Sequence, residues 1–337
     1  MDRFTAHLDR GWDLVTKGDL VGALCSAQEG LEIDNDSPEV HNLMGYIHAQ
    51  QGDVDTALQH YDQATALDET YIEAILNAAE LLIHPLHRFP EAAQKIDEAL
   101  EYCETADEIA DALILKIDAL LQHGQRDEAH RTLKRLPDGP FENPELVFRV
   151  GRARFDAGDA ESGFKLIEQA AELSPVNPEA LYYLGLALDA RGDSRLATLR
   201  FLQVRDLDLQ LPPPPWAIPP DQFERRVKTA IGRLPLPLQA HLDNSLVVVC
   251  ETPGAEVVAQ GVDPRAPLLF DSVEGEGADV SIGHIFVYQR NIERVVLGVA
   301  DIEDELFRCL EHELTAVREH PTMAKTRQGP LALKTKA

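Results

Sequence analysis

The chain has 337 residues, of which 44% are hydrophobic, so it is long enough for two or three domains with buried cores. Its formal net charge is −27 at pH 7, from 31 basic and 58 acidic side chains. This balance argues against nucleic acid as a partner, because phosphate binding requires a positive surface. It is compatible with a basic peptide or protein partner, or simply with an acidic surface that maintains solubility.

Neither a membrane segment nor a disulfide framework is indicated. No run approaches the ~20 apolar residues of a membrane helix. The first residues already follow the pattern of a helical repeat, so we expect no signal peptide. The four cysteines stand far apart and form no Cys-x-x-Cys pair: Cys25, Cys103, Cys250 and Cys309. We therefore expect a cytoplasmic protein that does not contact membranes.

Residues 38–71 contain small and large side chains that alternate at helical spacing. The small residues are Gly45, Ala57 and Ala64, and the large ones are Met44, Tyr61 and Leu67. Gly52-Asp53 interrupts the run between two helical halves. The pattern resembles a tetratricopeptide (TPR) repeat, in which small residues let two antiparallel helices approach and large ones fill the gaps between neighbours.

The pattern of residues 38–71 recurs along the first two thirds of the chain. We predict six repeats, at residues 4–37, 38–71, 72–109, 110–143, 144–177 and 178–211. Their starts are 34 residues apart, except for a step of 38 from the third repeat to the fourth, which contains the irregular segment His84–Pro90. Three repeats open with an N-cap residue, a proline and a glutamate, which is a typical helix start.

The first helices of such a stack line a concave face. The second position is acidic in five of the six repeats, and this favours a ladder of carboxylates for a basic ligand. The alternative is that a carboxylate simply stabilises the first turn of a helix. From this face we select seven candidate peptide-binding residues: Glu39, Asn42, Glu73, Glu145, Arg152, Glu179 and Tyr182.

Residues 212–221 are rich in proline, which removes backbone donors and enforces an extended conformation. We interpret them as a linker to a second domain at 222–320. In that domain the sequence predicts helices over 223–234 and 301–319, with strands at 246–251, 268–272 and 284–288. A basic tail at 321–337 is expected to be disordered. The predicted fold is mainly α, a TPR solenoid followed by a small α+β domain.

The second domain resembles the small bacterial zincin-like metallopeptidases. The resemblance rests on the opening helix that ends in Leu234-Pro235, the valine-rich strand at 246–251, and the segments 268–275 and 284–293. It implies zinc-assisted peptide hydrolysis by a His-Glu-x-x-His motif. The two histidines of that motif bind zinc, and the glutamate deprotonates the metal-bound water.

In this sequence the motif reads His-Glu-Leu-Thr-Ala from His312 to Ala316, so the second histidine is missing. His320 is a substitute candidate, but on an intact helix it lies ~12 Å along the axis from His312. A shared zinc requires both nitrogens within ~2.1 Å of the metal. An intact helix therefore excludes a zinc shared by the two histidines, and His320 could serve only if the chain folds back before Pro321. With that condition, the candidate metal ligands are His312 and His320, and Glu313 is the catalytic residue if the domain is active.

These observations lead to one main hypothesis and two alternatives. The main one is a TPR scaffold for a protein or peptide partner, fused to a zincin-like pseudo-peptidase that binds peptide or protein without catalysis. The first alternative is a divergent zinc-dependent metallopeptidase that its TPR repeats recruit to substrates. The second is a pure assembly scaffold. We expect no cofactor under the main hypothesis, and zinc under the first alternative.

Overall fold

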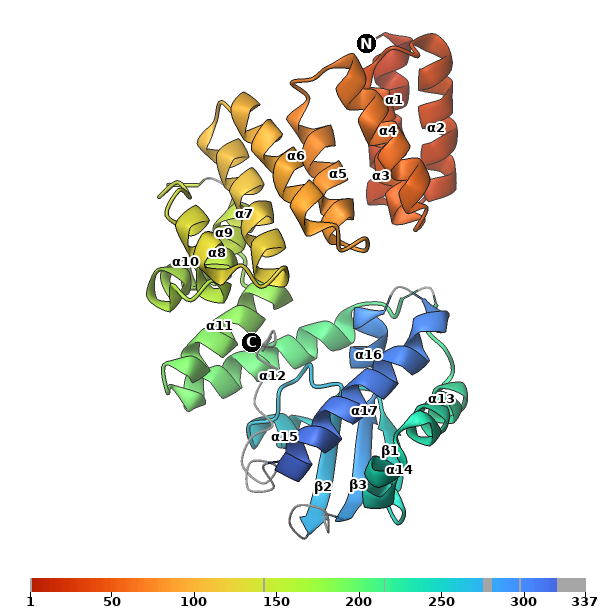
Figure 1. Ribbon diagram of the computed structural model, residues 1–337, viewed down its shortest axis with the longest axis vertical. Helices are drawn as coiled ribbons and strands as arrows, with labels where there is room; N and C mark the ends of the chain where they lie inside the picture. The colour runs from red at the N-terminus through yellow and green to blue at the C-terminus, as the bar shows by residue number, and fades with distance from the viewer. Residues whose placement is uncertain (1, 142, 215, 275–280, 297, 320–337) are drawn as a thin grey trace. The chain divides into compact units, whose positions relative to one another are not determined.

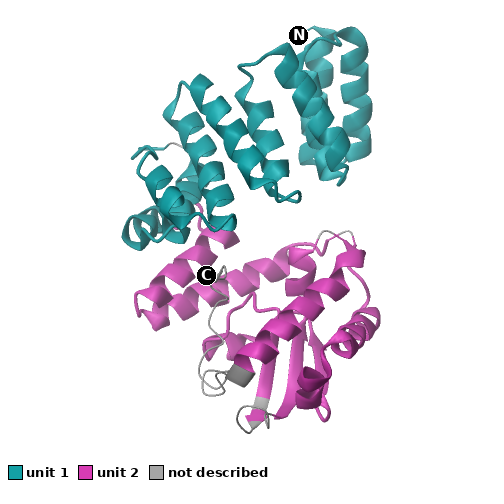
Figure 2. Cartoon of the chain, viewed as in Figure 1, with its two compact units in different colours: residues 1–170, 335–337 teal, residues 171–334 magenta. Residues whose placement is uncertain are grey.

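The computed structural model describes residues 2–141, 143–214, 216–274, 281–296 and 298–319. The chain divides into two compact units, residues 1–170 with 335–337 and residues 171–334 (Figure 2). The division falls within the helix α10 (Ala160–Leu173), so α11 and α12 belong to the second unit together with the sheet.

The first unit is built from successive helices, and those of a pair lie antiparallel (Figure 1). Their bounds are α1 (Arg3–Thr16), α2 (Leu20–Ile33), α3 (Pro38–Gln50), α4 (Val54–Leu67), α5 (Ile72–Ile83), α6 (Phe89–Tyr102), α7 (Ala106–Gln122), α8 (Arg126–Leu133), α9 (Pro144–Asp156) and α10. The first helices α1, α3, α5, α7 and α9 each contact the next one in the series.

A glycine–aspartate turn closes the helix pairs. Gly52 has φ +80°, a left-handed conformation that costs glycine little and other residues more. The carboxylate of Asp53 then caps α4 by accepting a hydrogen bond from the backbone N–H of Thr56 at 3.3 Å. Gly18-Asp19 and Gly192-Asp193 repeat the arrangement, so the predicted break between two helical halves is confirmed.

Small residues allow the two helices of a pair to touch. A Cβ atom added at Gly45 of α3 would lie 2.6 Å from Cε1 of Tyr61, whose ring is buried between α3 and α4. In the second unit, a Cβ at Gly185 of α11 would lie 2.5 Å from Cε1 of Phe201 of α12. The predicted alternation of small and large residues therefore corresponds to direct packing.

The irregular third repeat is accommodated in two places. The connection from α5 to α6 has no glycine, and His87 takes the left-handed conformation there, with φ 53°. In addition, α7 begins at Ala106, four residues before Ala110, where the sequence spacing starts the fourth repeat. A capping box formed by Thr105 and Glu108 stabilises this start, so much of the excess in length becomes one more helical turn.

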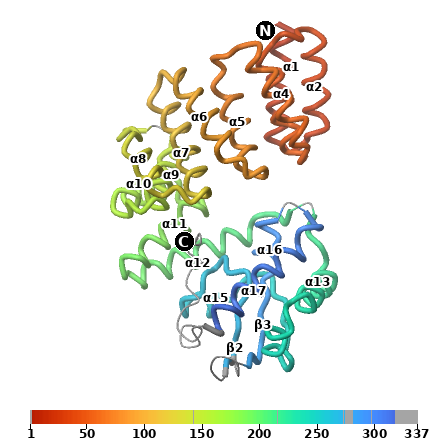
Figure 3. The backbone as a smooth tube through the Cα atoms, in the orientation of Figure 1, coloured from red at the N-terminus to blue at the C-terminus, as the bar shows by residue number. Residues whose placement is uncertain are grey.

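The second unit contains a further helix pair and a small sheet. Figure 3 traces α11 (Pro178–Ala190) and α12 (Ser194–Gln210), followed by α13 (Pro220–Arg233), α14 (Leu236–Gln239), α15 (Ala255–Ala259), α16 (Gln289–Val295) and α17 (Ile302–Glu319). The strands are β1 (Leu246–Cys250), β2 (Leu268–Glu274) and β3 (Ser281–Tyr288). The helices predicted over 223–234 and 301–319, and all three predicted strands, are therefore present within a few residues.

The sheet has the order β1-β3-β2. β1 pairs with β3 in parallel, with Leu246 opposite His284, whereas β2 pairs with β3 antiparallel, with Phe270 opposite Ile285. Helices α13 and α17 pack on each other and on the sheet. The core consists of apolar residues at helical spacing together with strand residues, including Phe223, Val227, Ile285, Val287, Leu306, Leu310 and Leu314.

The proline-rich segment is held to α16 by hydrogen bonds. Arg290 donates from Nη1 to the backbone carbonyls of Asp208 at 2.6 Å and Leu211 at 2.9 Å. Farther along, Gln289 donates to the carbonyl of Ile218 at 2.6 Å. The segment between α12 and α13 is therefore attached to the sheet region that it connects. Among the helices of the described ranges, none is both long and apolar enough to cross a membrane.

Candidate functional site

The ninth position of each repeat forms a row along the first unit. It holds Trp12, Tyr46, Glu80, Asp118 and Arg152, one from each first helix from α1 to α9. Together with the acidic second positions we call this set the first-helix face. It consists of Trp12, Glu39, Tyr46, Glu73, Glu80, Asp111, Asp118, Glu145 and Arg152. Five of these residues are absent from the candidates selected above: Trp12, Tyr46, Glu80, Asp111 and Asp118. Comparing the second and ninth positions of every repeat would have found them.

The end of the first-helix face at α1 and α3 is aromatic. The rings of Trp12 and Tyr46 lie with centroids 5.3 Å apart and planes inclined by 59°. Both side chains are partly exposed. A tilted aromatic pair with accessible edges offers an apolar contact surface with a polar rim.

The middle of the first-helix face is acidic. Glu39, Glu73 and Glu80 are exposed on the neighbouring helices α3 and α5. Burial raises the pKa of Tyr71 to about 12, and the carboxylates of Glu73 and Glu39 contribute to the increase. The pKa of the buried Tyr61 is raised in the same way, first by burial and then by Glu80. The carboxylates on α3 and α5 therefore create a negative electrostatic potential at both phenol groups.

A hydrogen-bonded cluster of polar side chains follows between α5 and α7. Nε2 of His84 lies 2.9 Å from Oδ2 of Asp118, and the side-chain amide of Gln122 donates to Oδ1 of Asp118 at 3.0 Å. The hydrogen bond to Asp118 raises the pKa of His84, whereas its partial burial and the nearby charge of Arg152 act in the opposite direction. Asp118, His84 and Arg152 are therefore neighbours on this face.

The remaining carboxylates of the first-helix face differ in their contacts. Asp111 pairs with Nη1 of Arg149 at 2.5 Å, which links α7 to α9. Glu145 is exposed in the first turn of α9. Arg152 lies on the same helix, with Nε 3.4 Å from a carboxylate oxygen of Asp156. On α3, Glu39 accepts a hydrogen bond from the hydroxyl of Ser37 at 2.5 Å. The carboxylates on α3 and α5 are thus exposed, whereas Asp111 of α7 is paired with an arginine of α9.

Asn42 lies between repeats rather than on the open face. Its side chain is fully buried. The amide nitrogen donates to the hydroxyl of Tyr71 at 3.4 Å, and the amide oxygen accepts a hydrogen bond from Asn77 at 3.0 Å. These bonds join α3 to α5, so the amide contributes to the interface between two repeats.

Glu179 and Tyr182 contact a loop of their own unit. The hydroxyl of Tyr182 donates to Oδ2 of Asp263 at 2.8 Å. Glu179 accepts a hydrogen bond from Nη1 of Arg265 at 2.9 Å. These two candidates are therefore occupied by the segment that precedes β2.

The degenerate motif lies on the exposed side of α17. His312 is 59% exposed and Glu313 31%, and Nδ1 of His312 lies 3.4 Å from Oε1 of Glu313. Leu310 and Leu314 point into the core, and Ala316 is exposed. The helix thus places position 316 one turn from His312 on the same side, as the spacing predicts.

The described residues contain no group of three or more His, Cys, Asp or Glu side chains arranged to hold a metal ion. His320, the substitute ligand candidate, lies outside these residues. His284 alternates along β3 with Ile285 and Val287, which are packed in the core with α17, so it projects from the other face of the sheet. There Nδ1 of His284 lies 3.6 Å from a carboxylate oxygen of Asp271.

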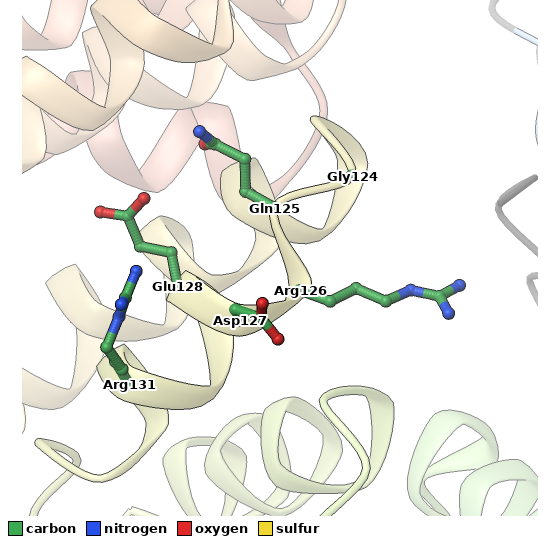
Figure 4. Close-up of a pocket in the computed structure, with 6 residues that line it drawn as sticks. All are labelled: Gly124, Gln125, Arg126, Asp127, Glu128 and Arg131. Atoms are coloured by element: carbon green, nitrogen blue, oxygen red, sulfur yellow. The ribbon is translucent and has the colours of Figure 1, made fainter.

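A shallow hollow of about 320 Å³ lies at the start of α8. It is lined by Gly124, Gln125, Arg126, Asp127, Glu128 and Arg131 (Figure 4). Arg126 points away from Glu128 and Arg131, so the side chains do not converge on a common point. We assign no binding role to this hollow.

Comparison with known proteins concerns the helical repeats. Residues 38–71 and 148–197 match models of the tetratricopeptide repeat. PilF of Pseudomonas aeruginosa is 17% identical, with a TM-score of 0.49 over 62% of this chain and 93% of its own. PilW, a type IV pilus biogenesis factor, is 18% identical, with a TM-score of 0.49 over 60% and 92%. A thermophilic TPR protein of Thermus thermophilus is 18% identical, with a TM-score of 0.46 over 55% and 98%. No curated protein sequence matches the chain.

Proposed function

We propose that this chain, whose TPR repeats form a scaffold for protein–protein interaction, holds a basic, extended segment of a partner on the first-helix face. The exposed carboxylates of Glu39, Glu73 and Glu80 would pair with lysine or arginine side chains of that segment. The aromatic pair of Trp12 and Tyr46 would contact an apolar side chain beside them.

The observation that carries this proposal is the position of Glu80 within its helix. A carboxylate in the first turn of a helix stabilises that helix, which accounts for Glu39 and Glu73 without any ligand. Glu80, however, lies in the last turn of α5, where the helix dipole disfavours negative charge. Asp118 has a similar position in α7, but its hydrogen bonds with His84 and Gln122 account for it. Recognition of a cation would account for Glu80.

The test is binding of a labelled basic peptide, with alternating arginine and leucine, to the full chain and its variants. We expect Glu80→Lys to weaken binding about tenfold, because it replaces an attractive charge by a repulsive one. The matched control is Glu101→Lys, an equal charge change at an exposed site on the second helix α6. Equal losses in both variants would mean that only the net charge of the protein attracts the peptide.

For the C-terminal domain, the proposal is a zincin-like module that binds peptide or protein without catalysis. Its support is the residue set on the exposed side of α17, where His312 and Glu313 are followed by Ala316 instead of a second histidine. A zinc ion held by one histidine of this helix would lack the paired ligands that peptidase sites use.

The alternative, a divergent zinc-dependent peptidase, is favoured by one observation: His312 and Glu313 are both accessible on the same helix. Metal analysis of the purified full chain separates the two functions. One zinc per chain that is lost in His312→Ala would support the peptidase, and a metal content that is independent of His312 would support the non-catalytic module.

A further inference from the structure

Arg265 in the second unit is bound by groups from both helices of the last TPR pair. Its Nη1 donates to Glu179 of α11 at 2.9 Å, and its Nε and Nη2 donate to the two carboxylate oxygens of Asp208 of α12 at 3.0 and 3.2 Å. The guanidinium carbon lies 4.5 Å from the centroid of the Tyr182 ring. The Arg265 side chain is only 10% exposed and that of Asp208 only 4%.

The backbone around Arg265 is also held in place. Asn291, which is buried, donates from its amide to the carbonyls of Pro264 at 2.9 Å and Ala266 at 2.8 Å. Asp263 accepts hydrogen bonds from the Tyr182 hydroxyl and from the backbone N–H of Arg265. Both the backbone and the side chains of the segment from Asp263 to Ala266 are therefore held by hydrogen bonds. A peptide ligand is bound by its receptor in the same way.

These contacts match the requirements of a guanidinium group in particular. A planar cation with five donors stacks on an aromatic ring and bridges carboxylates in a fork, which the compact ammonium group of lysine does not do. Glu179 and Tyr182 occupy the second and fifth positions of their repeat, the positions from which the sequence predicts peptide binding.

We propose that the last TPR pair carries a binding site for an arginine side chain, and that the segment Val262–Ala266 fills it as a built-in peptide ligand. This inference deepens the proposed function, on which it rests, because it identifies arginine within an extended segment as a ligand of the acidic second position. It also implies that the last pair is closed to external segments, which leaves the first-helix face for the partner.

The vacated site would retain excess negative charge. Without Arg265, the carboxylates of Glu179 and Asp208 would face Arg294, whose Nη2 lies 2.7 Å from Asp208 and whose Nη1 lies 3.8 Å from Glu179. One cation would then serve two carboxylates beside an uncovered Tyr182 ring. An arginine supplied from outside should therefore bind in its place.

The experiment uses the full chain with Arg265→Ala and ethylguanidinium, compared with ethylammonium, in a calorimetric titration. These probes have the size of the side chain that is removed, and Asn291 still holds the backbone of the segment in place. We expect ethylguanidinium to bind the variant about tenfold more tightly than ethylammonium does. We also expect it to bind the wild type about tenfold more weakly than the variant, because the site is already filled. Equal binding of the two probes, or equal binding by the two proteins, would overturn the proposal.

A thermal measurement adds a second readout. Ethylguanidinium should raise the melting temperature of Arg265→Ala relative to that of the wild type, whereas ethylammonium should not. Arg308→Ala, which removes an exposed arginine of α17, is the matched control and should show no such rescue. If Arg265→Ala does not fold by itself, it should refold in the presence of ethylguanidinium and not in the presence of ethylammonium, and the absence of this difference would overturn the proposal.

The two proposals can fail separately. Glu80→Lys lies in the first unit and should leave binding of ethylguanidinium to Arg265→Ala unchanged. Loss of basic-peptide binding in Glu80→Lys tests the first-helix face alone, and selectivity for arginine in Arg265→Ala tests the last pair alone.

Discussion

His60 is a titratable residue that the packing of repeats places where protonation is unfavourable. Its Nδ1 lies 3.1 Å from Nδ1 of His41, and its ring stacks on His48 with centroids 5.6 Å apart. Burial, followed by the neighbouring His41 and His48, lowers the pKa of His60 from 6.5 to about 4. The folded protein therefore binds fewer protons here than the unfolded chain between these two pH values.

The consequence is a loss of stability on acidification. The contribution of His60 is fully present above pH 6.5 and is lost as the pH falls toward 4, because the unfolded chain takes up the proton first. The side chain is partly exposed to solvent, which weakens the effect, so we expect only about 1 kcal/mol. Urea unfolding at pH 7 and pH 4.5 should show a larger loss for the wild type than for His60→Gln. An equal loss in both proteins would contradict this assignment.

A second prediction at this scale concerns the degenerate motif. Ala316→His would place a second histidine one turn from His312 on the exposed side of α17, and we expect zinc affinity to rise about tenfold. Zinc titration by calorimetry measures the change. The control is the same substitution combined with His312→Ala, in which the gain should disappear. A gain that survives without His312 would mean that the new histidine uses other ligands.

At the scale of elements, the close packing of two helices in a pair depends on glycine at their contact. Gly185→Leu would force new atoms into the ring of Phe201 and should cost about 1–3 kcal/mol of unfolding free energy. The matched control is Gly232→Leu on α13, where a Cβ has no neighbour within 4 Å. The melting temperature should fall for Gly185→Leu only. An unchanged value would show that α11 and α12 do not pack as described.

At the scale of the whole molecule, the proline-rich segment is the expected site of limited proteolysis. Leu211 is exposed, and a broad-specificity protease should cut between Leu209 and Gln222. We expect the fragments to stay associated in size-exclusion chromatography, because Arg265 and Arg294 join α12 to the sheet region across the cut. Fragments that separate under native conditions would indicate that these ion pairs contribute little to cohesion.

Local signals in the sequence determined most of the elements. The repeats, their glycine–aspartate turns, the two flanking helices and the three strands follow from periodicity and from residues with special backbone preferences, which act over a few positions. The additional turn of α7 and the short helices α14, α15 and α16 were not predicted, because no strong periodic pattern marks them.

Tertiary structure decided which candidate residues are accessible. Asn42 and Glu179 occupy equally plausible positions in the sequence, but the first is buried against Asn77 and the second is bound by Arg265. The parallel pairing of β1 with β3 likewise joins strands that are separated in the chain by β2. Arg265 meets Asp208 from 57 positions away and Glu179 from 86. Periodicity carries no information over such separations, because long-range packing and charge pairing set these contacts.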